Sequence, residues 1–198
     1  MGSPTAALTL VQEGNGKGSF TTDTPQRRFV IFDTDREYPQ PEAVGGVPNQ
    51  NLHADHDIDY VIAVPTGGKL IAQAERLAEL HRQRGLSVKV IPANLLYNEF
   101  SSGTPDANAL RRYLKMLYDR AATPDKAPRY LLLMGKSPWD NRFVTEEWKN
   151  ASIDDYLLAY EYDASTQSIG TVSSFVTDDF YALLDDGEGK YIYSEKVD

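Results

Sequence analysis

An acidic turn near the end of the sequence is the first candidate for chemistry. Asp185, Asp186 and Glu188 lie close together, with Gly187 between them. Neighbouring carboxylates repel one another, and calcium, which prefers hard oxygen ligands, would relieve that repulsion. The glycine allows the backbone to turn so that carbonyl oxygens face inward. The spacing is not that of an EF-hand, so we expect either a Ca²⁺ site or a solvated acidic loop.

Two histidines and an aspartate form a second candidate metal site. His53, Asp55 and His56 are near neighbours in the sequence, and imidazole and carboxylate groups both bind metal ions. They precede an expected strand, and nothing else in the sequence completes a ligand set for them. The alternative is a structural role, in which these side chains form hydrogen bonds within the fold.

Two glycine-lysine segments raise the question of a phosphate site. Residues 65–69 read Pro-Thr-Gly-Gly-Lys between an expected strand and an expected helix, and residues 135–137 read Gly-Lys-Ser. Neither segment has the full spacing of a P-loop or of a dinucleotide-binding loop. Simple turns are therefore expected at both places.

The sequence lacks the residues for nucleophilic catalysis. It contains no cysteine, which excludes a thiolate nucleophile, a disulfide and a zinc-thiolate site within the chain. Ser101 and Ser102 adjoin Gly103, but the segment is not the Gly-x-Ser-x-Gly elbow of hydrolases. We therefore expect no catalytic residue here, and no cofactor other than the possible Ca²⁺.

Composition narrows the possible partners. The 198 residues carry 29 acidic and 20 basic side chains, for a formal charge of −9. Nucleic-acid binders need a positive face, so a nucleic-acid partner is not expected. No apolar run approaches the roughly 18–20 residues that span a bilayer, so direct membrane insertion is not expected either.

The hydrophobic pattern of the middle of the chain predicts an α/β fold with a parallel sheet. Nearly continuous apolar runs indicate buried strands, and apolar residues at helical spacing lie between them. Gly85 is placed to end the first helix, because glycine accepts a left-handed backbone. Alternating strands and helices form parallel sheets with right-handed crossovers. The expected strands are residues 58–64, 86–92 and 129–134, with helices at 70–84 and from Thr104 onward.

The two ends of the chain follow other patterns. Residues 1–27 are expected to be a tail or lead-in, in which residues 6–12 are a possible strand, and residues 28–198 to be the α/β subdomain. Another strand is expected at residues 28–33. After Gly135 we expect β-hairpins added to the sheet, with short strands at residues 155–162, 170–176, 180–184 and 191–193.

Several segments together resemble family C25, the gingipain-type cysteine peptidases. They are Asn-Gln-Asn-Leu-His at residues 49–53, Tyr-Asn-Glu-Phe-Ser-Ser-Gly at 97–103, the strand 130–135, and Val-Thr-Asp-Asp-Phe-Tyr at 176–181. Their order and spacing carry the resemblance across residues 29–189. The positions assigned to the family motifs are Asn49, Gln50, Asn51, His53, Tyr97, Asn98, Asp178 and Asp179.

The resemblance implies a fold and a function. C25 peptidases have a caspase-like fold of two α/β subdomains, the first of which is Rossmann-like. The catalytic His and Cys lie in the second, so this chain is expected to end before them and to pack against that second subdomain. The first two motifs are more similar to the sortase-like peptidases of type IX secretion than to secreted gingipains. Protein substrates and an exported, cell-surface location are implied.

Two departures from the family pattern keep a second interpretation open. There is no cysteine, and Lys136 stands where the family often has an aspartate that helps to bind calcium. Asp140, Asp185 and Glu188 remain as acidic groups, and we expect the acidic turn to lie beside the loop 135–140, where Lys136 could replace calcium. The alternative function is a degenerate C25-like scaffold or binding module of a surface secretion assembly.

Overall fold

The computed structural model describes residues 11–13, 15, 17–21, 29–30, 33, 35–43, 45–161 and 176–188. The chain divides into two compact units, Met1–Gly46 and Val47–Asp198. In the first unit β1 (Val11–Glu13) pairs antiparallel with β2 (Lys17–Ser19). The described residues of the expected strand 28–33 are 29, 30 and 33, and they are not in a strand.

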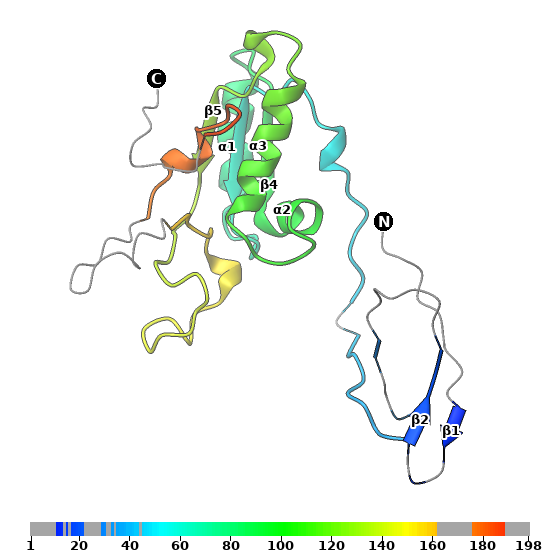
Figure 1. Cartoon of the computed structure of the whole chain (residues 1–198). Coiled ribbons are helices and arrows are strands. Elements are labelled where there is room, and N and C mark those ends of the chain that lie inside the picture. The colour runs from blue at the N-terminus through cyan, green and yellow to red at the C-terminus, as the bar shows by residue number, and fades with distance from the viewer. Residues whose placement is uncertain are drawn as a thin grey trace, which may run out of the picture. The chain divides into compact units, whose positions relative to one another are not determined.

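The second unit is built on a parallel sheet in which β3 is the central strand (Figure 1). It consists of β3 (Tyr60–Val64), β4 (Val88–Pro92) and β5 (Tyr130–Leu133), in the order β4-β3-β5. Both pairings are parallel, and Ile62 lies opposite Val90 on one side and Leu132 on the other. The predicted α/β class, parallel sheet and three strands are confirmed.

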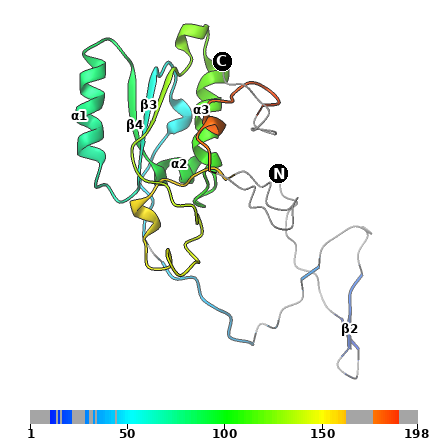
Figure 2. The same cartoon turned by 90° about the vertical axis from the view of Figure 1, so that its left-hand side faces the viewer.

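Helices cover both faces of the sheet (Figure 2). They are α1 (Ile71–Arg82) on one face, and α2 (Ala93–Phe100) and α3 (Asn108–Arg120) on the other. Alternate residues of β3 enter the two cores: Ile62 and Val64 pack with α1, and Val61 and Ala63 pack with α2 and α3. All four are 0% exposed, which explains why this strand reads as a continuous apolar run.

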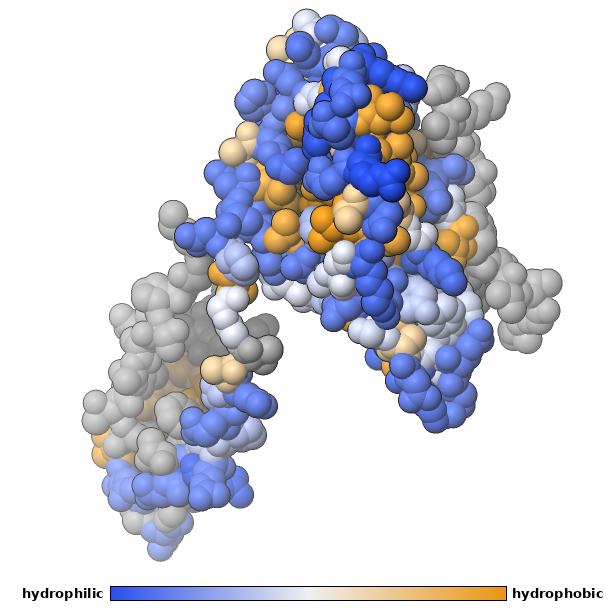
Figure 3. Space-filling model, turned by 180° about the vertical axis from the view of Figure 1, so that it is seen from behind, coloured by the Kyte–Doolittle hydropathy of each residue, from blue (hydrophilic) through white to orange (hydrophobic). Residues whose placement is uncertain are grey.

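Helix α1 lies close to the sheet through small residues and ends where the sequence predicts. Ala74 and Ala78 are its buried residues. Gly85 has φ +88°, and the amide of Leu86 donates to the carbonyl of His81, which closes the helix end. The face on which α1 lies shows apolar surface between its charged side chains (Figure 3), and Leu80 is 45% exposed.

Helix α2 was not predicted from the sequence, and α3 begins later than predicted. Helix α2 follows β4 without a loop, and its eight residues are too few to show a clear period. Helix α3 starts at Asn108 rather than near Thr104, because Asp106 Oδ1 accepts the amide of Asn108 at 2.9 Å. Thr104 instead donates its amide to the Ser101 carbonyl in the preceding turn.

One aspartate joins the amino ends of all three strands. Asp59 Oδ2 accepts the amide of Ser87 at 2.8 Å, and Oδ1 accepts Arg129 Nη2 at 2.7 Å. Its carbonyl accepts the amides of Arg129 and Tyr130. Burial alone would raise the pKa of Asp59, but these bonds and the nearby charge of Arg129 lower it.

The region after β5 is less β-rich than expected. Residues Asp179–Tyr181 form a 3-10 turn, η5, where a strand 180–184 was expected. That prediction is wrong because Phe180, Tyr181, Leu183 and Leu184 are all buried, which is the spacing of a helical turn and not of an alternating strand. Ile153–Asp155 is another 3-10 turn, η3. Among residues 155–161, the described part of the expected strand 155–162, only Glu161 forms a bridge, antiparallel to Val176. The remaining expected strands lie largely or wholly outside the described residues.

A single guanidinium fixes this last segment to α3. Arg111 donates from Nε to the carbonyl of Phe180 at 3.1 Å, and from Nη2 to the carbonyls of Leu183 and Glu188. The group also lies over the Phe180 ring, 4.9 Å from its centroid. Arg111 therefore satisfies three backbone acceptors that no strand pairing serves.

We expect Arg111→Ala to lower the free energy of unfolding by about 3 kcal/mol, because charge-assisted hydrogen bonds and a cation–π contact are lost together. Urea titration measures the change. Arg76→Ala, at an exposed position on α1, is the matched control and should change stability by less than about 0.5 kcal/mol. Equal stabilities for the two variants would contradict this role of Arg111.

Candidate functional site

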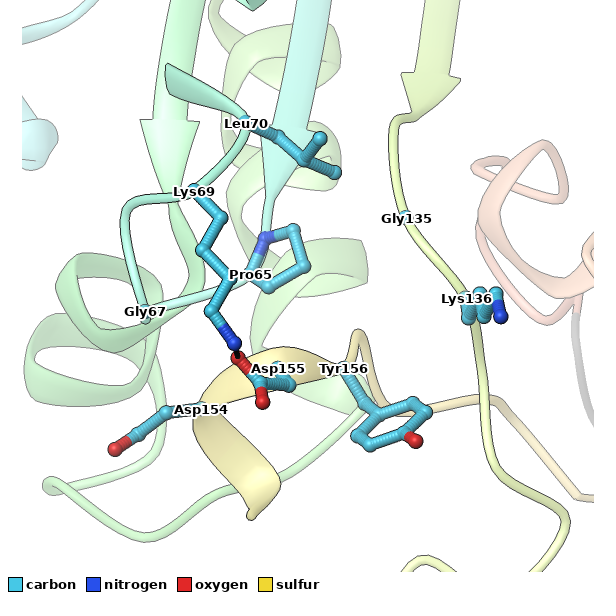
Figure 4. Close-up of a pocket in the computed structure, with 9 residues that line it drawn as sticks. All are labelled: Pro65, Gly67, Lys69, Leu70, Gly135, Lys136, Asp154, Asp155 and Tyr156. Carbon is cyan, nitrogen blue, oxygen red and sulfur yellow. Dashed lines mark hydrogen bonds and ion pairs between the residues drawn. The ribbon is translucent and has the colours of Figure 1, made fainter. Parts of the chain in front are cut away.

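A cavity of about 320 Å³ opens between the carboxyl ends of β3 and β5 (Figure 4). Three segments surround it: the turn after β3, the first residues after β5, and the 3-10 turn η3. Its lining residues are Pro65, Gly67, Lys69, Leu70, Gly135, Lys136, Asp154, Asp155 and Tyr156.

The topology explains why a cavity forms here. The chain leaves β3 through α1 on one face to reach β4, and leaves β4 through α2 and α3 on the other face to reach β5. The strand order therefore reverses between β3 and β5, the two neighbouring strands that no single crossover connects. This is the switch point of an open parallel sheet, where such folds bind ligands.

Close backbone contacts hold the three segments together. The amide of Gly67 donates to the carbonyl of Asp154 at 2.6 Å, and the amide of Leu157 donates to the carbonyl of Lys136 at 2.9 Å. A Cβ atom at Gly67 would lie 2.8 Å from the Asp154 oxygen, and one at Gly135 would lie 3.0 Å from Pro65 Cγ. Both glycines are needed for this approach, so residues 65–69 form a packed turn, as predicted.

Two lysines and two aspartates line the cavity: Lys69, Lys136, Asp154 and Asp155. Lys69 Nζ lies 2.5 Å from Asp155 Oδ1, with side chains 73% and 39% exposed. Lys136 is exposed, and among the described residues its ammonium group has no hydrogen-bond or ion-pair partner. The Asp154 carboxylate points away from Lys69 (Figure 4). The residues present can bind a ligand, and they offer no thiol for covalent catalysis.

The family-motif positions fall into two groups in space. Glu99, which lies within the second motif, accepts hydrogen bonds from Gln50 Nε2 at 2.8 Å and from the Leu52 amide at 2.7 Å. It also accepts the amide of His53, and His53 Nδ1 lies 2.5 Å from its Oε2. Asn98 Nδ2 donates to Gln50 Oε1 at 3.1 Å. Glu99 thus binds the first motif to α2.

The other motif positions do not share that cluster. Tyr97 is buried, and burial raises its pKa to about 12. Asp178 and Asp179 accept turn hydrogen bonds with their carbonyl groups, from Tyr181 and Ala182 respectively. Asn51 accepts the amide of Ala54 with its carbonyl, and Asn49 is exposed.

The side chains of the histidine cluster form contacts within the fold, as the structural alternative to a metal site predicts. His53 is bound to Glu99 and stacks on Phe100, with ring centroids 4.5 Å apart. Asp55 accepts Lys89 Nζ and the Tyr113 hydroxyl, each at 2.9 Å. His56 contacts its neighbour Asp57 at 3.2 Å. The three side chains thus have different partners and do not converge.

The acidic turn docks on α3, where its cation partner is Lys115 and not Lys136 as expected. Lys115 Nζ lies 2.9 Å from Asp186 Oδ1, and the Tyr118 hydroxyl donates to Asp185 Oδ1 at 2.7 Å. Glu188 Oε2 accepts the amide of Asp185 at 2.7 Å. The hydrogen bond and charge of Lys115 lower the pKa of Asp186.

Calcium at this turn stays a prediction, and the arrangement does not favour it. Within the part of the chain that the structure describes, no group of three or more His, Asp or Glu side chains could hold a metal ion. Asp140, the other available acid, is 8% exposed and accepts the amides of Thr145, Arg142 and Val144. These hydrogen bonds, that of Thr145 first, lower its pKa.

Sequence reasoning missed Glu99 and Lys115, the two residues that organise these clusters. Glu99 was part of a quoted motif but was not singled out. Its partners Gln50 and Leu52 are 49 and 47 residues away, and Lys115 is 71 residues from Asp186. Local periodicity carries no signal for such pairs.

Among the described residues there is no helix long and apolar enough to cross a membrane.

We expect Glu99→Gln to destabilise the protein by about 2 kcal/mol at pH 7, because a 14% exposed carboxylate loses charge-assisted hydrogen bonds. Burial alone would raise the pKa of Glu99, but the bonds from Leu52, Gln50 and His53 outweigh it and lower the pKa from 4.5 to about 2. This stabilisation is present above about pH 4.5 and is lost as the pH falls toward about 2.

The measurement is urea unfolding of both proteins at several pH values between about 3 and 7. The Glu99→Gln variant should lose less stability on acidification than the unaltered chain. Glu147→Gln, at an exposed position, is the control and should follow the unaltered chain. Parallel pH profiles for Glu99→Gln and the unaltered chain would show that Glu99 does not stabilise the fold as a carboxylate.

Comparison with known proteins gives the family. The model described as "Peptidase family C25" matches residues 53–196, and a search of curated proteins finds no match. Among solved structures, dimeric latent PorU from Porphyromonas gingivalis is similar, with a TM-score of 0.64 and 39% identity. The match covers 75% of this chain and 14% of that chain, so this chain spans a small part of that protein. Because the family model matches more than half of the sequence, the chain belongs to peptidase family C25.

Proposed function

We propose that this chain is the first, non-catalytic subdomain of a PorU-like C25 cysteine endopeptidase that processes exported proteins at the bacterial cell surface. The observation that carries the proposal is the C25 match over residues 53–196 of a chain that contains no cysteine. A cysteine peptidase needs a thiolate nucleophile, so the nucleophile belongs to another part of the parent protein. The similarity to PorU supports the PorU-like assignment and the type IX secretion context.

The geometry supports two contributions of this subdomain to the enzyme. The cavity at the carboxyl ends of β3 and β5 has the position of a ligand site in a parallel α/β sheet, so it can form one wall of a peptide groove. The outer edge of β5, which has no partner strand among the described residues, lines a second groove with apolar residues such as Leu114 and Leu184 and charged residues such as Arg129 and Asp178. We assign that groove to packing against the second, catalytic subdomain.

Within the intact enzyme, the second subdomain supplies the reacting groups and this subdomain supplies part of the substrate groove. A thiolate of the second subdomain attacks the scissile carbonyl, with a histidine of the same subdomain as base. The residues of this chain orient the substrate and exclude water beside the reacting atoms. Their contribution is therefore to binding and positioning.

The test compares this chain with a longer protein that includes the downstream region of the parent. We expect the 198-residue chain to hydrolyse no peptide and to take up no iodoacetamide by mass spectrometry, because it has no thiol. The longer protein should acquire one reactive thiol and peptidase activity that iodoacetamide abolishes. Activity of the short chain after removal of contaminating proteases would contradict the proposal.

A C25-like scaffold is the second candidate, and one observation favours it. Lys136 places an exposed ammonium group at the end of β5, where the family resemblance leads one to expect an aspartate. A domain with a changed site of this kind can serve binding without catalysis. A longer protein that has no reactive thiol and no peptidase activity would establish the scaffold and exclude the enzyme.

A further inference from the structure

We propose that the cavity between β3 and β5 binds a peptide carboxylate, with Lys136 as the primary cation and Lys69 as the second. The inference rests on the proposed function, since it names the chemistry that this wall of the groove selects. The juxtaposition that carries it is a switch-point cavity of about 320 Å³ lined by two lysines from different loops.

The state of Lys136 is the first argument. Its backbone is fixed, since its carbonyl accepts the amide of Leu157 at 2.9 Å and Gly135 packs against Pro65. The fold therefore fixes the backbone position from which this side chain reaches the cavity. Its ammonium group has no anionic partner in the described part of the chain, although the chain carries a formal charge of −9. An unpaired cation at the edge of a cavity is a ready partner for an incoming anion.

The ion pair of Lys69 is the second argument. Lys69 is bound to Asp155 at 2.5 Å, but both side chains are substantially exposed, at 73% and 39%. Exposed pairs contribute little to stability, so the pair can open without a large cost. Among the described residues, Lys69 is the only partner of the Asp155 side chain. Asp155 thus occupies Lys69 as a ligand carboxylate would, and a bound peptide can replace it by carboxylate exchange.

The apolar part of the lining is the third argument, and it favours a peptide over a small inorganic anion. Pro65 and Leu70 line the cavity beside the two lysines, and the Tyr156 ring forms part of its wall (Figure 4). Tyr156 is held by Trp148 and Phe143, with ring centroids 5.3 and 5.7 Å away. An apolar surface next to two cations fits an acidic group that is flanked by aliphatic side chains.

The experiment titrates the ¹⁵N-labelled 198-residue chain with three peptides and follows amide shifts. The probes are acetyl-Ala-Leu-Glu-Leu-Ala-amide, the same peptide with Gln for Glu, and the Gln peptide with a free C-terminal carboxylate. We expect the Glu peptide or the free-acid peptide to bind about five-fold more tightly than the uncharged peptide, with shifts at Gly67 and Gly135. Which of the two binds identifies a side-chain or a chain-end carboxylate as the ligand.

Two variants make the test specific. Lys136→Gln should remove the five-fold preference, whereas Lys126→Gln, at an exposed position before the amino end of β5, should keep it. Asp155→Asn should tighten binding of the preferred peptide about two-fold or more, because it frees Lys69. A purely structural role of the Lys69–Asp155 pair predicts no such gain.

Equal binding of all three peptides, or a preference that survives Lys136→Gln, would overturn the inference. Weaker binding by Asp155→Asn would overturn the exchange step. None of these titrations depends on peptidase activity. A failed peptide titration with an active longer protein therefore contradicts only this inference, while binding together with an inactive longer protein contradicts only the proposed enzyme.

Discussion

The central strand β3 pairs on both edges and is covered on both faces, and the arrangement of the second unit follows from that. Val61, Ile62, Ala63 and Val64 are completely buried, and each of the three larger side chains contributes roughly 1.5–3 kcal/mol through apolar burial. Since successive residues point to opposite faces, the strand requires a helix layer on each side. Right-handed crossovers then place α1 on one face and α2 with α3 on the other. The cavity between β3 and β5 is the geometric consequence.

Around that apolar centre, single charged groups fix segments that lack regular hydrogen-bond partners. Asp59 joins the amino ends of the strands, Glu99 binds the segment before β3 to α2, and Arg111 holds the last described segment on α3. Asp140 does the same within its own loop. Each satisfies backbone groups through charge-assisted bonds, which are stronger than neutral ones. The protein therefore uses ionised side chains where a sheet or helix would use backbone partners.

This construction separates stability from function. The charged groups that bind backbone segments are buried, as Asp140 is, or partly buried, whereas the lysines of the cavity are exposed and carry weak or no pairing. Membership of family C25 relates the scaffold to a family of peptidases, and the chain itself contains no thiol. Under the proposed function, the cavity and the outer edge of β5 are the two surfaces through which this subdomain acts on the rest of the enzyme.

The sequence by itself determined the features that depend on local periodicity and composition. The hydrophobic pattern predicted three parallel strands, at residues 58–64, 86–92 and 129–134. A strand buried on both faces reads as a continuous apolar run, and a strand buried on one face alternates apolar and polar residues. Gly85 predicted the end of α1, because a helix often ends at a residue with a left-handed backbone, which glycine adopts readily. The absence of cysteine excluded a thiolate nucleophile within this chain, and the ordered motifs indicated the C25 family.

Only the tertiary structure decided which charged groups meet. The acidic turn pairs with Lys115 and not with Lys136, because α3 brings residues 71 positions apart into contact. Residues 179–181 form a 3-10 turn where a strand 180–184 was expected, because Arg111 and the core supply the partners of this segment. The two lysines of the cavity likewise come from different loops, Lys69 from the turn after β3 and Lys136 from the segment after β5. Such pairings depend on chain crossovers through space, and a linear pattern of residue types does not encode them.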